Sequence, residues 1–126
     1  MGFVASLFIC GYNLVMNFNA KLVLLEDGDG FFGPGVRDLF LFIDSEKSVK
    51  AASEKMQISY SKAWRMIRNV EKAIGTTAVA RFHGGPEGGS ACLTEAGRDI
   101  LEKYIQFEKL SKAAIEPIFE EQFGIK

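Results

Sequence analysis

The sequence predicts a mainly α-helical domain with a small β component, arranged as a winged helix-turn-helix. Two observations support this fold class. A short small-residue helix, a tight turn and a longer amphipathic helix with basic residues follow one another over residues 48–74. A glycine-rich loop at residues 84–89 then separates two short β-prone runs, as the loop of a wing does. At 126 residues the chain has the length of one domain with a single core.

The formal net charge of −1 says little about partners, but the charge is unevenly distributed. Residues 59–98 carry six Lys or Arg against three Asp or Glu. Residues 1–58 carry five against seven, and residues 99–126 carry four against six. A basic excess in the middle of the chain predicts one basic face, which is typical of a nucleic-acid contact.

Cys10 and Cys92 are the only cysteines, and His83 is the only histidine. These numbers are too small for a disulfide framework or a multi-histidine metal centre. The sequence therefore predicts a reduced, cytoplasmic protein with no metal site and no cofactor.

Residues 1–19 are apolar and contain no Lys or Arg before Lys21. They lack the basic start and the small-residue cleavage site of a secretory signal, and they are short for a membrane span. We expect a poorly ordered or non-native extension here, with Met16 as the natural start, and no membrane partner. Residues 20–126 are then expected to form the winged helix-turn-helix domain that binds DNA and dimerises.

A β-hairpin is predicted at the start of this domain. Residues 21–25 are a short β-prone run, residues 26–30 repeat Asp-Gly as turns do, and Phe31-Phe32 form the returning strand. Gly33-Pro34-Gly35 ends the strand before a helix. The carboxylates of the turn lack the spacing and the closing Glu of a calcium loop, so they indicate a solvated turn.

The first helix is predicted over residues 36–45. Apolar residues recur in it at the helical period and form one buried stripe, which consists of Val36, Leu39, Phe40 and Ile43. Leu41 and Phe42 fall outside that stripe, so a second surface must cover them. A partner subunit is the simplest cover, which predicts a homodimer.

The second helix is predicted over residues 49–56, with Ser48 as its N-cap. Its Ala51-Ala52 pair suits two helices that cross closely over a short turn. Gln57-Ile58 forms that turn, and Ser59 caps the third helix, which is predicted to end at Gly75. The apolar positions of the third helix, Tyr60 among them, follow the helical period, and Trp64 is expected to anchor the core.

The outward positions of the third helix are candidates for DNA contact. Arg and Lys can bind guanine in the major groove, and hydroxyls and free N–H groups at a helix start can bind phosphates. A solvated face with ordinary charges is the alternative, and the preceding turn and the following wing favour DNA. The candidates are Ser59, Tyr60, Ser61, Lys62, Arg65, Arg68, Asn69 and Lys72.

The wing is predicted from two strands, residues 79–82 and 91–93. The loop between them is not a P-loop, because it leads into a strand and lacks the Gly-Lys-Ser/Thr sequence. Cys92 is expected to be a small half-buried strand residue rather than a nucleophile. The wing adds four candidate DNA contacts, of which the first two can reach the backbone or the minor groove: Arg81, His83, Gly84 and Gly85.

A long last helix is predicted after its cap, Thr94. An apolar stripe runs along it beyond the winged unit, and Pro117 either kinks it or begins a new helix. A helix with no core left to cover should pair with a second subunit, which places two reading heads about one turn of DNA apart. This helix adds four residues to a dimer interface that also includes Leu41 and Phe42: Ile100, Tyr104, Phe107 and Ile118.

Several of these motifs together resemble the N-terminal domain of the ModE family of molybdate-responsive transcriptional regulators. The shared pattern comprises Ser59-Tyr60 with Ala63-Trp64 and Ile67, the double-glycine wing, and residues 90–97. The lead-in at residues 32–35 and Ala51-Ala52 match as well, so the likeness covers roughly residues 20–120. The chain is similar, more distantly, to LysR-type DNA-binding domains. The resemblance implies a homodimeric winged helix-turn-helix joined by its first and last helices.

The chain departs from this family in two respects. Full-length members carry a C-terminal molybdate-binding module that has no counterpart before Lys126, so we do not expect molybdate sensing to carry over. The family wing usually has a basic residue between its glycines, where this chain has Pro86-Glu87. A carboxylate near phosphates is repulsive, so the tip of this wing is expected to add little to DNA affinity.

Three functions compete. The favoured one is a sequence-specific, double-stranded DNA-binding transcriptional regulator that acts as a homodimer, with an unidentified effector and a link to molybdate metabolism. The same fold could instead serve as a protein-interaction module without DNA readout. An enzyme or a small-molecule sensor built around Cys92 and His83 lacks a further acid–base partner, so the chain is predicted not to be an enzyme.

Overall fold

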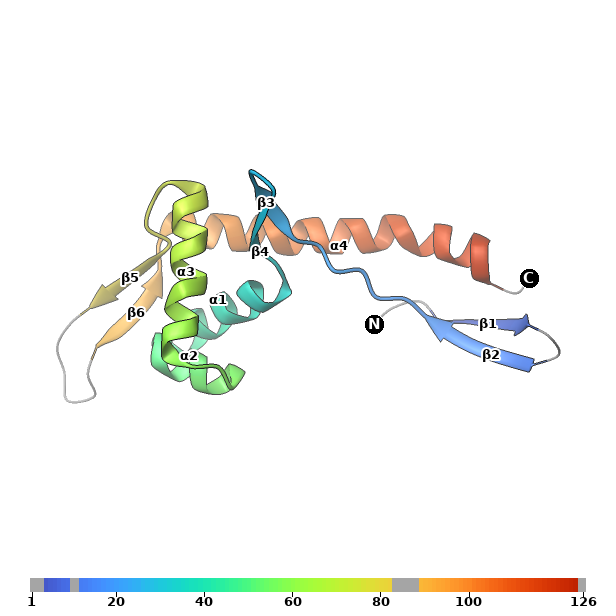
Figure 1. Ribbon diagram of the computed structural model, residues 1–126, viewed down its shortest axis with the longest axis horizontal. Helices are drawn as coiled ribbons and strands as arrows, with labels where there is room; N and C mark the ends of the chain where they lie inside the picture. Colours follow the sequence, from blue (N-terminus) through green and yellow to red (C-terminus); the bar gives the residue numbers. More distant parts are fainter. Residues whose placement is uncertain (1–3, 10–11, 83–88, 125–126) are drawn as a thin grey trace. The chain divides into compact units, whose positions relative to one another are not determined.

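The computed structural model of the chain describes residues 4–9, 12–82 and 89–124. These residues fall into two compact units, one formed by residues 22–105 and the other by residues 1–21 together with 106–126. Within the described residues, the strands pair into three antiparallel two-stranded sheets, and four helices follow the order seen in Figure 1. The two units are described separately below.

The unit of residues 22–105 begins with the predicted hairpin. Strand β3 (Leu24–Glu26) pairs with β4 (Asp29–Phe32), and an irregularity in the register lies between Leu24 and Leu25. The turn is shorter than predicted and consists of Asp27 and Gly28, whose φ angles are 49° and 84°. Asp-Gly suits this turn because both central residues of a tight hairpin turn need a positive φ.

Helix α1 (Pro34–Glu46) begins two residues before the predicted start at residue 36. Pro34 fits the first helical position because its missing N–H would have no partner there. The helix ends at Lys47, which has a left-handed φ of 57° and donates its N–H to the carbonyl of Ile43. The predicted stripe is confirmed in its centre, where Leu39, Phe40 and Ile43 are buried.

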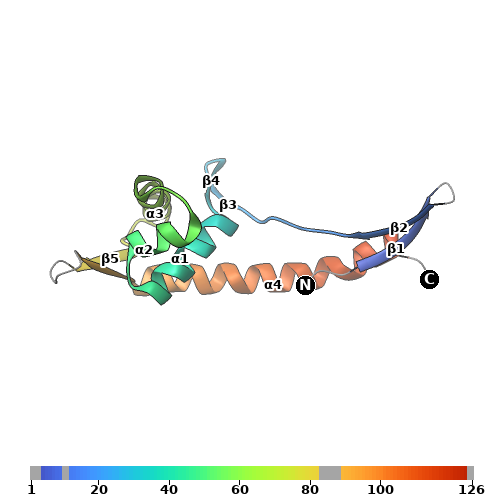
Figure 2. The same ribbon diagram turned by 90° about the horizontal axis from the view of Figure 1, so that it is seen from below.

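The helix-turn-helix matches its predicted bounds. Helix α2 (Val49–Met56) is capped by Ser48, whose hydroxyl accepts a 3.0 Å hydrogen bond from the N–H of Ala51. Gln57 takes a left-handed φ of 58° at the turn, and helix α3 (Tyr60–Ile74) follows and ends at Gly75. Figure 2 shows α1, α2 and α3 gathered into one bundle. Ala52, Ala63 and Trp64 belong to its buried core.

The wing consists of β5 (Val79–Phe82) and β6 (Ser90–Leu93), with Val79 paired to Leu93 and Phe82 paired to Ser90. Two contacts attach it to the helices. The Glu71 carboxylate of α3 accepts hydrogen bonds from the N–H groups of Ala78 at 2.8 Å and Val79 at 3.3 Å. The N–H of Ala91 donates to the carbonyl of Lys47 at the end of α1. With this wing beside α3 (Figure 1), the predicted winged helix-turn-helix fold is confirmed.

Helix α4 (Glu95–Phe123) is continuous, with Pro117 inside it, so no new helix begins there. Thr94 is confirmed as its cap, because its hydroxyl accepts a 3.0 Å hydrogen bond from the N–H of Gly97 and donates to the carbonyl of Thr77. Gly97 packs closely against the backbone of Ala78. A Cβ atom at position 97 would overlap the Ala78 carbonyl oxygen.

The first part of α4 covers the core of its own chain, which corrects the expectation that this helix has no core left to cover. Leu101 is buried, and Tyr104 is only 1% exposed. The Tyr104 ring lies 4.9 Å from the ring of Phe32, and its hydroxyl donates a 2.8 Å hydrogen bond to the carbonyl of Leu22. Tyr104 is therefore not on a surface available to a second subunit, and its assignment to the dimer interface is wrong.

The second unit contains a hairpin that the sequence does not predict. Strand β1 (Val4–Ile9) pairs with β2 (Tyr12–Asn17), and their register runs from Val4–Asn17 to Ile9–Tyr12. At the other end of the chain the Phe119 ring is buried and lies 4.9 Å from Phe18. This grouping differs from the predicted division into residues 1–19 and 20–126, since residues 106–126 group with the start of the chain. Among the described residues, no helix has the length and apolar character needed to cross a membrane.

Candidate nucleic-acid interface

Helix α3 has one buried and one exposed face. Its buried face consists of Ala63, Trp64, Ile67 and Val70. Every polar residue that the sequence assigns to the opposite face is exposed in the structure: Ser59, Ser61, Lys62, Arg65, Arg68, Asn69 and Lys72. The predicted core role of Trp64 is confirmed, since this side chain is 8% exposed.

The N-terminus of α3 has features that favour binding of an anion. The Ser59 hydroxyl accepts a 3.0 Å hydrogen bond from the N–H of Lys62, which is the bond expected of a cap. Because the hydroxyl acts here as an acceptor, its own proton is still available to a phosphate oxygen. The positive end of the helix dipole adds to the attraction at this position.

Tyr60 differs from its predicted place in the apolar period of α3, because it is 49% exposed. Its ring meets the Trp64 ring edge to face at a centroid distance of 6.4 Å. One side of the Tyr60 ring, at the first position of the helix, therefore contacts the core, and the rest of the ring is exposed to solvent. This placement is compatible with the role of Tyr60 in the candidate DNA-contact set.

The cations of α3 are electrically uncompensated. Lys62, Arg65 and Arg68 form no ion pair with any residue in the described part of the chain. Two cations of α4 in the same unit are paired instead: Arg98 lies 2.6 Å from the Asp44 carboxylate, and Lys103 lies 2.9 Å from Asp99. The exposed face of α3 therefore has a positive potential that an external anion can neutralise.

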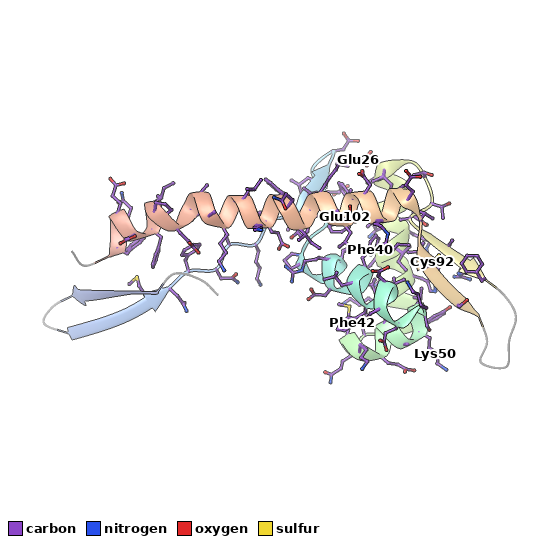
Figure 3. The ribbon with its side chains drawn as sticks, turned by 180° about the vertical axis from the view of Figure 1, so that it is seen from behind. Glu26, Phe40, Phe42, Lys50, Cys92 and Glu102 are labelled. Atoms are coloured by element: carbon purple, nitrogen blue, oxygen red, sulfur yellow. The ribbon has the colours of Figure 1, made fainter. Side chains whose placement is uncertain are left out.

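The wing contributes Arg81, which is exposed on β5 and stacks on the Trp64 ring with its Cζ atom 3.7 Å from the ring centroid. Three other predicted wing contacts, His83, Gly84 and Gly85, lie outside the described residues. Cys92 is a half-buried residue of β6, as predicted, and is labelled in Figure 3.

An open cleft of about 560 Å³ lies between the start of α2, the start of α3 and the wing. Three of its lining residues carry polar groups and are absent from the predicted site: Ser48, Lys50 and Ser90. Lys50, labelled in Figure 3, is exposed in the first turn of α2. The sequence gives no local signal for it, because a lysine in a short polar helix is ordinarily a solvated residue. Only the fold brings it to the same cleft as Arg81.

The predicted dimer residues divide between the two units. In the unit of residues 22–105, Leu41 is 42% exposed, while Phe42 and Ile100 are half-buried against the core. In the other unit, Phe107 is 47% exposed and Ile118 is 59% exposed. Leu110, which the prediction omits, is also 59% exposed. Phe107, Leu110 and Ile118 follow helical spacing, so they share one face of α4.

Comparison with known proteins agrees with this geometry. Residues 38–98 match the family described as bacterial regulatory helix-turn-helix protein, lysR family. The matched span starts within α1 and ends within α4, and it includes α2, the turn, α3 and the wing. Residues 38–98 form a LysR-type helix-turn-helix domain. The distant resemblance to LysR-type domains drawn from the sequence is thereby confirmed.

Two curated proteins are similar to most of this chain. The molybdenum transport protein ModE of Azotobacter vinelandii is 31% identical over 78 residues, which are 62% of this chain and 29% of that protein. The molybdenum-pterin-binding protein MopB of Rhodobacter capsulatus is 29% identical over 85 residues, which are 68% of this chain and 32% of that protein. The chain thus spans about a third of the length of these relatives.

Proposed function

We propose that this protein is a sequence-specific, double-stranded DNA-binding transcriptional regulator that acts as a homodimer in the cytoplasm. The observation that carries the proposal is the exposed face of α3, whose cations have no ionic partner among the described residues. The LysR-type domain over residues 38–98 supports the same function.

In the proposed complex α3 enters the major groove. Lys62, Arg65 and Arg68 then lie where they can donate hydrogen bonds to guanine O6 and N7. The hydroxyls of Ser59 and Ser61 and the free N–H groups of the helix start bind phosphates and fix the orientation of the helix. Arg81 contacts the sugar–phosphate backbone or the minor groove from the wing.

The homodimer is supported by the apolar face formed by Phe107, Leu110 and Ile118 on α4. Exposure of apolar side chains along one face of a helix is unfavourable in water, and a second copy of the chain would bury them. A twofold dimer binds two half-sites about one turn of DNA apart, so each subunit reads one half of a palindrome.

The names of the two relatives refer to molybdenum transport and to molybdenum-pterin binding. We therefore propose that the regulated genes belong to molybdenum metabolism. Sequencing of genomic fragments captured by the purified protein should return sites upstream of such genes. Enrichment of unrelated loci alone would contradict this assignment while leaving DNA binding intact.

Fluorescence anisotropy with duplex DNA from the captured sites tests the function directly. Arg65→Ala and Arg68→Ala should each weaken binding by ~1–3 kcal/mol if the side chain contacts a base edge, and the preference for the captured duplex over a scrambled one should fall. Lys103→Ala removes the same charge from the exposed surface of α4 and serves as the matched control. Equal affinity for wild type and both α3 variants, at all salt concentrations, would show that α3 does not read DNA.

The alternative function as a protein-interaction module gives a different pattern in the same experiment. The wild-type protein would then bind no duplex above the non-specific level, and its affinity for captured and scrambled DNA would be equal.

A further inference from the structure

The Arg81–Trp64 contact joins the wing to α3, and the two elements have different roles in the proposed complex. Arg81 belongs to strand β5 of the wing, and Trp64 belongs to α3. The 3.7 Å distance from the guanidinium carbon to the ring centroid is that of a planar cation stacked on an aromatic face. The contact therefore ties the wing to the helix proposed to lie in the major groove.

Stacking leaves the hydrogen-bonding capacity of Arg81 available. A guanidinium stacks through its face, whereas its five N–H donors lie in its plane and point outward. Arg81 is exposed, and none of the carboxylates in the described ranges forms an ion pair with it. Its donors are thus free for an external acceptor while its position is fixed from one side.

Trp64 is well placed to hold this cation. Its side chain is 8% exposed, and Tyr60 packs edge to face against it. The indole Nε1 is buried and has no hydrogen-bond partner within the described part of the chain, so no hydrogen bond there orients the ring. The ring is held by apolar packing and by the guanidinium above it.

We propose that Trp64 is a positioning residue for DNA binding: its ring holds Arg81 so that the guanidinium donors face the DNA backbone before the complex forms. The inference rests on the proposed function. Its physical basis is preorganisation, because a side chain ordered in the free protein loses less conformational entropy on binding. Tyr60, which touches the same ring, supports the position of Trp64 rather than that of Arg81.

A double-mutant cycle tests the coupling. DNA affinity is measured for wild type, Trp64→Phe, Arg81→Ala and the double variant on the captured duplex. Trp64→Phe keeps an aromatic ring in the core but offers a weaker cation–π face, so it should weaken binding about 2- to 5-fold when Arg81 is present. In the Arg81→Ala background the same substitution should change affinity by less than about 1.5-fold, because the proposed partner is already gone. Equal losses in both backgrounds would show a purely structural role for Trp64 and overturn the proposal.

Arg81→Lys provides a second, independent measurement. A lysine keeps the charge but lacks the planar face, so this variant should retain the wild-type dependence of affinity on salt while it binds more weakly. Arg81→Ala should reduce the slope of log affinity against log salt concentration by about one, the amount expected for the loss of one phosphate contact. A wild-type affinity for Arg81→Lys would show that stacking plays no part and would overturn the proposal.

The free protein gives a readout that needs no DNA. Trp64 is the only tryptophan of the sequence, so emission excited at the red edge of the absorption band, where the three tyrosines do not absorb, reports on this ring alone. Arg81→Ala should change the emission intensity, whereas Arg68→Ala, which removes an unpaired cation of α3, should leave it unchanged. An unchanged emission in Arg81→Ala would refute the contact itself. Failure of the wild type to bind any duplex would instead refute the proposed function, and the inference with it.

Discussion

At the scale of single residues, the side chains of α3 divide cleanly between folding and proposed binding. Ala63, Ile67 and Val70 are fully buried, whereas the cations Lys62, Arg65 and Arg68 of the same helix are exposed. Trp64 takes part in both, since its ring closes the core and carries Arg81 on one face. Substitutions on the exposed side of this helix are therefore expected to alter affinity with little effect on stability.

Gly97 provides a residue-scale prediction about packing. A Cβ atom there would overlap the Ala78 carbonyl oxygen, which is backbone and cannot rotate away. Gly97→Ala should lower the free energy of unfolding by ~1–3 kcal/mol, as overpacking of a tight contact does. Urea denaturation followed by circular dichroism measures the change.

Gly35 supplies the matched control for this prediction. It lies in helix α1, and a Cβ atom there would meet only the Met66 side chain at 3.8 Å, which is an ordinary contact. Gly35→Ala should therefore stabilise the protein by up to ~1 kcal/mol through helix propensity. Equal effects of the two substitutions would contradict the close approach at Gly97.

At the scale of elements, specific polar contacts join helices and strands. Glu71 links α3 to the beginning of β5, Lys47 links the end of α1 to β6, and Thr94 links the start of α4 to the segment before β5. Asp44 of α1 forms an ion pair with Arg98 of α4. Each of these links uses residues near an element's end, so the elements themselves can follow local sequence preference.

The Asp44–Arg98 pair predicts a pH dependence of stability. The hydrogen bond from the Arg98 guanidinium, followed by its positive charge and that of Lys47, lowers the pKa of the Asp44 carboxyl from its ordinary value of 3.8. A carboxyl whose pKa is lower in the folded state stabilises the fold above the unfolded-state pKa, and this contribution is lost as pH falls through the folded-state pKa.

Asp44→Asn should therefore lower stability at pH 7, and the difference from wild type should shrink as the pH is taken below 4, near and then below the ordinary pKa of 3.8. The pair is partly exposed, so the effect should be small and should weaken further in high salt. Thermal denaturation from pH 7 to pH 2.5 measures it, with Asp99→Asn, from an exposed pair within α4, as control. A difference that is constant over this pH range would contradict the role of the ionised carboxyl.

The elements could be predicted from the sequence wherever the signal is local. Ser48, Ser59 and Thr94 are caps, Gly75 ends α3, and the bounds of α2 agree with those predicted. The continuation of α4 through Pro117 could not be predicted, because the residue type alone favours a break.

Contacts between distant residues account for most of the remaining differences. Tyr104 belongs by helical spacing to the apolar stripe that the sequence assigns to a dimer surface. Its hydroxyl nevertheless donates a hydrogen bond to the carbonyl of Leu22, which lies far away in the sequence. Lys50 and Arg81 share a cleft only because the wing folds back beside α2 and α3. Periodicity shows that a residue is on a face, but it does not show what covers that face.

At the scale of the whole molecule, the central expectation is the homodimer. Phe107 and Ile118 lie on one face of α4, and a charge placed there would be buried without a partner in a dimer. Phe107→Glu with Ile118→Glu should therefore give a monomer at micromolar concentration by light scattering.

The same double variant should lose affinity for a duplex with two half-sites while keeping its affinity for a single half-site, because only the two-site complex needs both subunits. Gln106→Glu introduces a charge at an exposed neighbouring position and is the control for charge alone. A wild-type protein that is already monomeric at this concentration would contradict the proposed dimer.

The Glu71 carboxylate has a consequence for how an operator would be selected. By accepting hydrogen bonds from Ala78 and Val79, it fixes the separation between the end of α3 and the beginning of the wing before any ligand arrives. If α3 and the wing both contact DNA as proposed, the double helix would have to match this separation through its own groove width. Base pairs that the protein never touches would then influence occupancy through the stiffness of the DNA.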